Sequence, residues 1–273
     1  MSLPHKSLVI ISTYNQPVWL EKVLYGYEHQ TIKDFEIIIA DDGSTINTKR
    51  VIDSFNKREK LKIQHIWQED DGFRKTKILN KAIAVSNCDY LIISDGDCIP
   101  RQDFVETHLK LRKAGCFLSG GYFKLSKHIS KLIIKEDIET QRCFTKDWLI
   151  SKGLKKSFKF NKLTSKGYKE WLLNTFTTTK ATFDGMNVSA WKKDIIKVNG
   201  FDERMHYGGE DRELGERLIN FGIKPLQIRY SAICLHLHHS RNYMNDEDLL
   251  KNKAIRKQTK TFKKVWTDFG INQ

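Results

Sequence analysis

The chain has 273 residues, of which 40% are hydrophobic and 29% are charged, as in a globular protein rather than a disordered one. That length suits one large α/β domain or two small ones, and no apolar run approaches the ~20 residues of a transmembrane helix. The first residues lack the pattern of a signal peptide. Five cysteines without CxxC spacing argue against a disulfide framework and a cysteine zinc site, so we expect a cytoplasmic protein.

The formal net charge of +14 is concentrated in two segments. Residues 146–169 contain eight lysines and one acid, and residues 251–264 contain seven basic residues and no acid. Each segment contributes +7, so the rest of the chain sums to about zero. The pattern indicates a neutral main domain with two basic attachments.

Short apolar runs alternate with helical patterns over the first 95 residues. Strands are predicted at residues 8–12, 35–40, 61–67 and 89–94. Helices are predicted between them, beginning at residue 17 and spanning 46–58 and 76–86. This order predicts an α/β fold with a mainly parallel, Rossmann-like sheet flanked by helices. Because ligands bind beyond the carboxyl ends of such strands, we expect Thr13, Asp42, Arg74 and Asp95 at one edge.

The alternation fades after residue 125. We predict a nucleotide-binding half at 1–125, a basic helical insertion at 126–182, a second half at 183–240 and a basic amphipathic tail at 241–273. In the tail, apolar residues recur at helical spacing from about 246 to 269.

Two acidic motifs follow predicted strands. In Asp95-Gly96-Asp97, carboxylates one residue apart can face a single hard cation. In Asp41-Asp42, a carboxylate can accept a hydrogen bond from uracil or ribose. Asp and Gly are also common in ordinary turns, and each motif taken alone allows both interpretations.

Three further groups point to the chemistry of a site. Arg74 and Lys75, followed by Asn80, offer cations to a diphosphate, although a solvated helix start would look the same. Tyr207-Gly208-Gly209 precedes the adjacent acids Glu210 and Asp211, which suits acceptor binding and proton removal as well as a simple helix N-terminus. His236 and His238 share one face of a predicted strand and suggest metal ligation.

In this order the motifs resemble a known family. Ser12-Thr-Tyr-Asn15, Asp41-Asp-Gly-Ser44 and Asp95-Gly-Asp97 resemble family 2 of the nucleotide-sugar glycosyltransferases. Gly185-Met-Asn187, Gly200-Phe-Asp202, Gly208-Gly-Glu-Asp211 and His236-Leu-His238 are similar to the carboxyl-terminal half of the β-1,4-galactosyltransferases and to bacterial chondroitin polymerases. The resemblance covers about residues 7–125 and 183–240 and implies the GT-A fold.

The resemblance also implies a role for each matching residue. Asp97 binds Mn²⁺ (or Mg²⁺) with help from Asp95, and His236 or His238 completes the metal site. Asp211 is the general base, and the acceptor meets Tyr207, Gly208, Gly209 and Glu210. The implied donor-binding residues are Thr13, Tyr14, Asn15, Asp41, Asp42, Arg74, Lys75, Asn80, Asp95 and Gly96. Tyr207 stands where relatives often carry tryptophan, so we carry over no acceptor preference.

The implied activity is inverting transfer of a hexose or N-acetylhexosamine from a UDP-sugar to a hydroxyl of a glycan or glycolipid acceptor, in bacterial surface polysaccharide or lipopolysaccharide synthesis. One alternative is a nucleotidyltransferase on a similar sheet, which should carry a glycine-rich loop after the first strand. Another is a basic nucleic-acid-binding protein, for which we find no module motif. We therefore expect no nucleic-acid partner.

The basic segments predict an anionic partner, either a membrane surface or a charged glycan acceptor. The tail pattern suits a helix lying in a lipid interface, with the protein peripheral at the inner face of the membrane. The competing interpretation is that Phe262, Trp266 and Phe269 pack on the main domain while the lysines face water.

Overall fold

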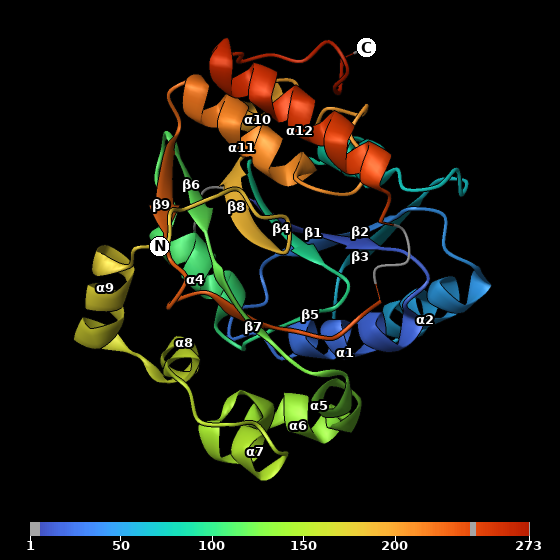
Figure 1. Ribbon diagram of the computed structural model, residues 1–273. Helices are drawn as coiled ribbons and strands as arrows, with labels where there is room; N and C mark the ends of the chain where they lie inside the picture. The colour runs from blue at the N-terminus through green and yellow to red at the C-terminus, as the bar shows by residue number, and fades with distance from the viewer. Residues whose placement is uncertain (1–5, 241–243, 273) are drawn as a thin grey trace.

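The computed structural model describes residues 6–240 and 244–272, and a seven-stranded mixed sheet forms its centre (Figure 1). Residues 1–5, 241–243 and 273, which belong to the expected first half and tail, lie outside the described residues. The first four strands pair in parallel, and β8 pairs antiparallel with both β4 and β6. The strand order is β3 (Ile63–Trp67), β2 (Glu36–Asp41), β1 (Ser7–Thr13), β4 (Tyr90–Asp95), β8 (Asn187–Trp191), β6 (Cys116–Ser119) and β9 (Lys224–Gln227).

Both faces of the sheet are covered by helices, as continuous apolar strands require. On β1, Val9 and Ile11 face one core cluster, and Leu8 and Ile10 face the other. The first cluster includes α1 (Pro17–Glu28), α2 (Ile46–Asn56) and α4 (Phe104–Leu111). The second includes α3 (Lys75–Val85), α10 (Lys192–Lys197) and α11 (Glu210–Asn220). The strands and helices predicted up to residue 95 are thus all present, with ends shifted by at most a few residues.

A second, three-stranded sheet lies beside the first and joins distant parts of the chain. It has the order β5 (Cys98–Pro100), β10 (Ile233–His236) and β7 (Gly121–Lys124). Strand β10 is antiparallel to β5 and parallel to β7. In this register His236 lies opposite Cys98, next to Asp97. This pairing brings a residue from near position 240 to the acidic motif after β4.

The segment between β7 and β8 consists of short helices below and to the left of the large sheet in Figure 1. Ile129, Ile133, Ile138, Leu149 and Phe160 are buried against the first core cluster. The helices are α5 (Lys127–Leu132), α6 (Lys135–Glu139), η1 (Arg142–Phe144), α7 (Lys146–Ser151), η2 (Phe158–Phe160), α8 (Asn161–Thr164) and α9 (Gly167–Phe176).

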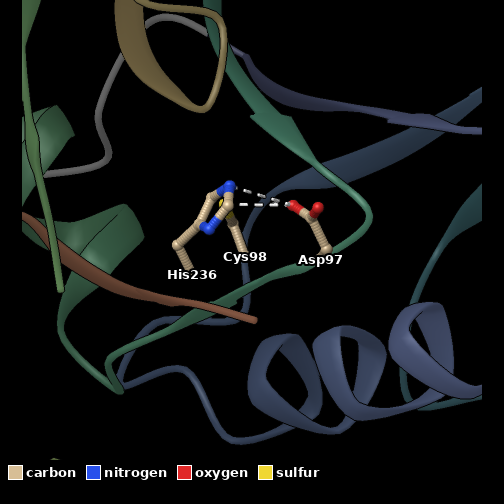
Figure 2. A group of neighbouring side chains, drawn as sticks. All are labelled: Asp97, Cys98 and His236. Carbon is tan, nitrogen blue, oxygen red and sulfur yellow. Dashed lines mark hydrogen bonds and ion pairs between the residues drawn. The ribbon is translucent and has the colours of Figure 1, made fainter. Parts of the chain in front are cut away.

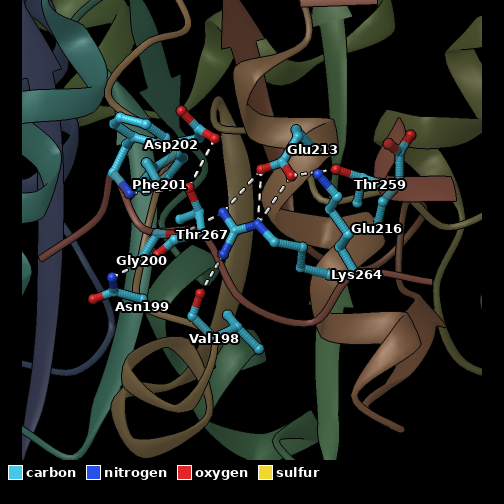
Figure 3. Close-up of polar contacts among 12 residues, drawn as sticks. Val198, Asn199, Gly200, Phe201, Asp202, Glu213, Glu216, Thr259, Lys264 and Thr267 are labelled. Atoms are coloured by element: carbon cyan, nitrogen blue, oxygen red, sulfur yellow. Dashed lines mark hydrogen bonds and ion pairs between the residues drawn. The ribbon is translucent and has the colours of Figure 1, made fainter. Parts of the chain in front are cut away.

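Helix α11 is anchored by a buried arginine. The guanidinium of Arg217 pairs with Glu213 one turn earlier at 2.8 Å and donates to the carbonyl oxygens of Val198 and Gly200 (Figure 3). A buried ion pair costs stability unless its remaining donors are satisfied, and here backbone oxygens satisfy them. The Gly200-Phe-Asp202 motif therefore fixes α11, whose first residues are Glu210 and Asp211.

The tail forms a helix only in its first part. Helix α12 (Asp246–Thr261) packs on α11, and the chain leaves the helix at Phe262 before Lys263, which has a positive φ of 50°. The last residues fold back, so that Thr267 Oγ1 donates to Asp202 Oδ2 at 2.8 Å (Figure 3). The expected helix to about residue 269 is therefore too long, and the tail packs on the main domain.

Candidate active site

A cleft of about 740 Å³ opens where the ends of β1 and β4 face the start of α11. Parallel strands deliver their carboxyl ends to this edge, and most of the predicted site residues line the cleft. These are Thr13, Tyr14, Asn15, Asp42, Lys75, Asp95, Gly96, Asp97, Tyr207, Gly208, Gly209, Glu210, Asp211 and His236.

Four predicted residues point elsewhere. The carboxylate of Asp41 accepts from Ser44 N and bonds His65 Nε2, both at 2.9 Å, and so supports the turn after β2. The guanidinium of Arg74 pairs with Asp71 outside the cleft. Asn80 is buried and holds the backbone of Phe201. His238 lies away from the cleft, and its backbone amide donates to Ser130 Oγ.

At one end of the cleft lies Asp42. Its two carboxylate oxygens accept from Gln68 Nε2 at 2.6 Å and from the backbone amide of Arg74 at 2.8 Å. Burial raises the pKa of Asp42 to about 6 despite these hydrogen bonds. Nearby, Thr13 Oγ1 is buried and has no hydrogen-bond partner within the described residues. This end offers acceptors for N–H and hydroxyl groups, as a base and a ribose require.

The centre of the cleft holds the candidate metal ligands. His236 Nε2 is 4.0 Å from Asp97 Oδ1, and His239 Nε2 is 3.3 Å from Asp97 Oδ2. Figure 2 shows His236 pointing at Asp97 from the neighbouring strand. Burial raises the pKa of Asp97, and His236 Nδ1 is buried without a hydrogen-bond partner in the described part of the chain.

These groups fit a divalent cation. A carboxylate with two imidazoles is a donor set that Mn²⁺ accepts, and a cation would compensate the buried charge of Asp97. Cys98 Sγ also lies close, but burial raises the pKa of this thiol well above its usual value. A protonated thiol is a poor ligand, so we expect oxygen and nitrogen donors. His239 takes the place predicted for His238, because β10 ends at His236 and the strand alternation ends with it.

Lys75 connects the acidic motif with α11. Asp95 Oδ1 accepts from Lys75 Nζ and from Ser12 Oγ, both at 2.6 Å. Burial opposes the charge of Lys75, but the carboxylates of Asp95, Glu210 and Asp211 outweigh it and raise the lysine's pKa. The cleft therefore contains a permanent cation among its acids, where a diphosphate would need one.

Three carboxyl groups face the other end of the cleft. Asp211 Oδ2 accepts from the backbone amide of Gly185 at 2.9 Å, and Glu210 Oε2 accepts from that of Gly208 at 2.9 Å. Burial and the charge of Asp211 raise the pKa of Glu210 to about 7 and that of Asp184 to about 6. Sequence reasoning missed Asp184, and its only signal was its place beside the Gly185-Met-Asn187 motif.

Helix α12 closes the side of the cleft next to the two glycines. Asn252 is fully buried, and its amide donates to the carbonyl oxygens of Tyr207 and His206 at 3.2 and 3.0 Å. Gly208 has a φ of +116°, and a Cβ there would lie 2.4 Å from the side chain of Leu249. The tail thus fixes the loop that carries the predicted acceptor-binding residues.

Two known family models match separate parts of the chain. Residues 8–127 match glycosyl transferase family 2, and residues 174–240 match the family described as the N-terminal domain of galactosyltransferase. The first part of the chain therefore matches glycosyl transferase family 2, and a later part matches a galactosyltransferase family. The two matched regions carry all the described lining residues of the cleft except Leu249 and Arg256, which lie on α12. The predicted family and its galactosyltransferase-like second part are confirmed.

Individual relatives agree with this family. The chain is 27% identical to validoxylamine A glucosyltransferase from Streptomyces hygroscopicus over 86% of its own length and 56% of the relative's. It is 27% identical to chondroitin synthase from Escherichia coli, over 80% of this chain and 34% of the relative. The chain thus spans about half or less of these curated relatives.

The fold agrees as well. The crystal structure of GalNAc-T7 with UDP, GalNAc and Mn²⁺ superimposes with a TM-score of 0.64 at 14% sequence identity, covering 93% of this chain and 48% of that one. Such a likeness confirms the predicted GT-A fold. No helix within the described residues is both long and apolar enough to cross a membrane.

Proposed function

We propose that this glycosyltransferase-family protein transfers a hexose or N-acetylhexosamine from a UDP-sugar to a hydroxyl of a glycan or glycolipid, with inversion. The observation that carries the proposal is the cleft itself. One end of the cleft holds the buried carboxylate of Asp42, its centre holds the carboxylate–histidine group at Asp97, and its other end holds a pair of acids on α11. We further propose that the reaction belongs to bacterial surface polysaccharide or lipopolysaccharide synthesis, at the cytoplasmic side of the membrane.

The chemistry follows from the order of these groups along the cleft. Asp42 and Thr13 bind the nucleoside, and Lys75 contributes positive charge next to the diphosphate. Asp97, His236 and His239 would hold a divalent cation, which would compensate the negative charge of the leaving diphosphate. Asp211 accepts the proton of the acceptor hydroxyl. The oxygen of that hydroxyl bonds to the anomeric carbon while the bond from this carbon to the β-phosphate oxygen breaks. A single displacement inverts the anomeric centre.

The donor is tested by screening nucleotide sugars. We expect UDP-hexoses or UDP-N-acetylhexosamines to raise the unfolding temperature in the presence of Mn²⁺, because a ligand that binds only the folded state stabilises it. One of them should also be slowly hydrolysed. Stabilisation by GDP-sugars alone would contradict the choice of donor, and stabilisation by no nucleotide sugar would contradict the function.

A pH dependence of donor binding follows from Asp42. Both of its carboxylate oxygens accept hydrogen bonds fully only when the group is ionised, and its pKa is raised to about 6. We expect UDP affinity to fall below pH 6 by up to about tenfold per unit, because the protonated form must first lose its proton. Titration calorimetry from pH 5 to 8 measures this loss. The Asp42→Asn variant should bind more weakly at pH 8 and lack the dependence, and an unchanged profile would contradict the role of Asp42.

A further inference from the structure

The basic insertion carries a hollow that the cleft chemistry does not use. It has a volume of about 580 Å³ and lies between α7, η2, α8 and α9. Three lysines, two hydroxyl groups and an amide line it, and no carboxylate is among its lining residues in the described structure. These polar residues are Lys146, Lys156, Lys169, Ser157, Thr164 and Asn161. Such a set of donors suits a phosphate-type anion.

The short helices that line this hollow also expose large aromatic side chains. Phe158 is 70% exposed, and on α9 Tyr168 and Phe176 are 74% and 73% exposed. Trp171 is 55% exposed and stacks on Tyr168 with ring centroids 5.6 Å apart. Helix α9 has no buried residue. Folding alone does not explain so much aromatic surface on one short segment, which marks it as an interaction site.

The same segment is attached to the cleft. Lys162 on α8 donates from Nζ to the carbonyl oxygen of Tyr122 at 2.9 Å, and the Tyr122 ring lines the cleft with its centroid 6.0 Å from that of His236. On α9, the amide of Asn174 donates to Ser231 Oγ at 2.8 Å, shortly before β10. A body bound to the insertion would therefore lie next to the wall of the cleft that Tyr122 and His236 form.

We propose that this surface, the lysine-lined hollow with Phe158, Tyr168, Trp171 and Phe176, docks the protein on a bilayer of anionic phospholipids. The lysines would meet lipid phosphates, and the aromatic rings would enter the headgroup layer, where Trp and Tyr are enriched. The hollow without acids favours phosphate, and four exposed rings favour a lipid interface over a free soluble anion.

Helix α12 is the other basic element, and its inner face is already occupied. Asn252 and Thr259 are buried, and Arg256 pairs with Glu216 on α11 at 2.5 Å. Within the helix Leu250 is the markedly exposed large hydrophobic residue, and beyond its end Phe262, Trp266 and Phe269 are 71%, 44% and 42% exposed but lie apart from the lysine-lined hollow. The two basic elements also lie on opposite sides of the large sheet in Figure 1, so one flat membrane would not engage both. We therefore assign α12 to support of the acceptor loop and the insertion to membrane binding.

The test compares two variants of equal charge. In the first, Lys146, Lys156 and Lys169 become Gln, and in the control the exposed Lys251, Lys253 and Lys257 of α12 become Gln. Flotation with phosphatidylglycerol–phosphatidylcholine vesicles is expected to capture the native protein, and pure phosphatidylcholine is expected to capture far less. Since each lysine near an anionic surface is worth about fivefold, the first variant should lose on the order of 100-fold in affinity and the control less than about tenfold.

The aromatic residues give a second readout. Replacing Trp171 and Phe176 by Ser should weaken binding at high salt, where electrostatic attraction is screened and ring insertion remains. Thermal unfolding of each variant verifies that the surface changes leave the fold intact. Equal losses in the two lysine variants, absence of vesicle binding, or stronger capture by an anionic polysaccharide than by the vesicles would each overturn the membrane assignment.

Discussion

Replacing Asp97 by Asn is expected to abolish sugar transfer, with a loss of more than about 100-fold. Removing even a supporting residue of a metal site costs about 10–100-fold, and a direct ligand costs more. Both His236 and His239 approach the carboxylate of Asp97 within 4.0 Å. EDTA should have the same effect on the native protein, and added Mn²⁺ should reverse it. Transfer rates with and without metal measure both effects.

Metal binding gives a readout that does not depend on turnover. Calorimetric titration with Mn²⁺ and UDP should show binding to the native protein and none to Asp97→Asn. Burial raises the pKa of Asp97, so its negative charge lowers the stability of the folded protein at neutral pH. Without metal, Asp97→Asn should therefore unfold at the same temperature as the native protein or at a higher one. The control Asp53→Asn removes a half-exposed carboxylate on α2 and should leave both properties unchanged. Full activity of the native protein in EDTA would contradict the metal site.

Replacing Asp211 by Asn should lower turnover by about 10²–10⁴-fold, the usual cost of losing a general base. The amide keeps the shape of the side chain and can still accept from Gly185 N, but it takes up no proton. UDP binding should survive, because Asp42 and Lys75 are untouched. Steady-state turnover and UDP affinity of the same preparation separate the two effects.

Glu210→Gln is the matched comparison for this base. Glu210 is buried against the backbone of Gly208, and we expect its loss to weaken acceptor binding more than turnover. The pKa of Glu210 is raised to about 7, which would also suit a base. If Asp211→Asn turns over almost normally while Glu210→Gln is inactive, the two acids have exchanged roles.

The sequence alone predicted the first half of the fold well. The strands at β1, β2, β3 and β4 follow from compact apolar runs, and the helices between them follow from apolar residues at helical spacing. Strands β5, β6 and β7 and helix α4 received no prediction, because they are short and their partners lie far along the chain. The edge of the sheet on which the cleft lies was predicted too, since it depends only on strand direction.

Other features depend on contacts between distant segments. His236 meets Asp97 because β10 pairs with β5, and His239 replaces His238 because that strand ends at His236. Asn80 is conspicuous in sequence, yet its amide is used to hold Phe201. The amphipathic tail pattern allowed a membrane helix or a packed one. In the structure Asn252 is buried against the acceptor loop, whereas Phe262 and Trp266 remain 71% and 44% exposed. Local periodicity determines the helices and strands. The contacts of each side chain are determined only when helices and strands that are distant in sequence pack together.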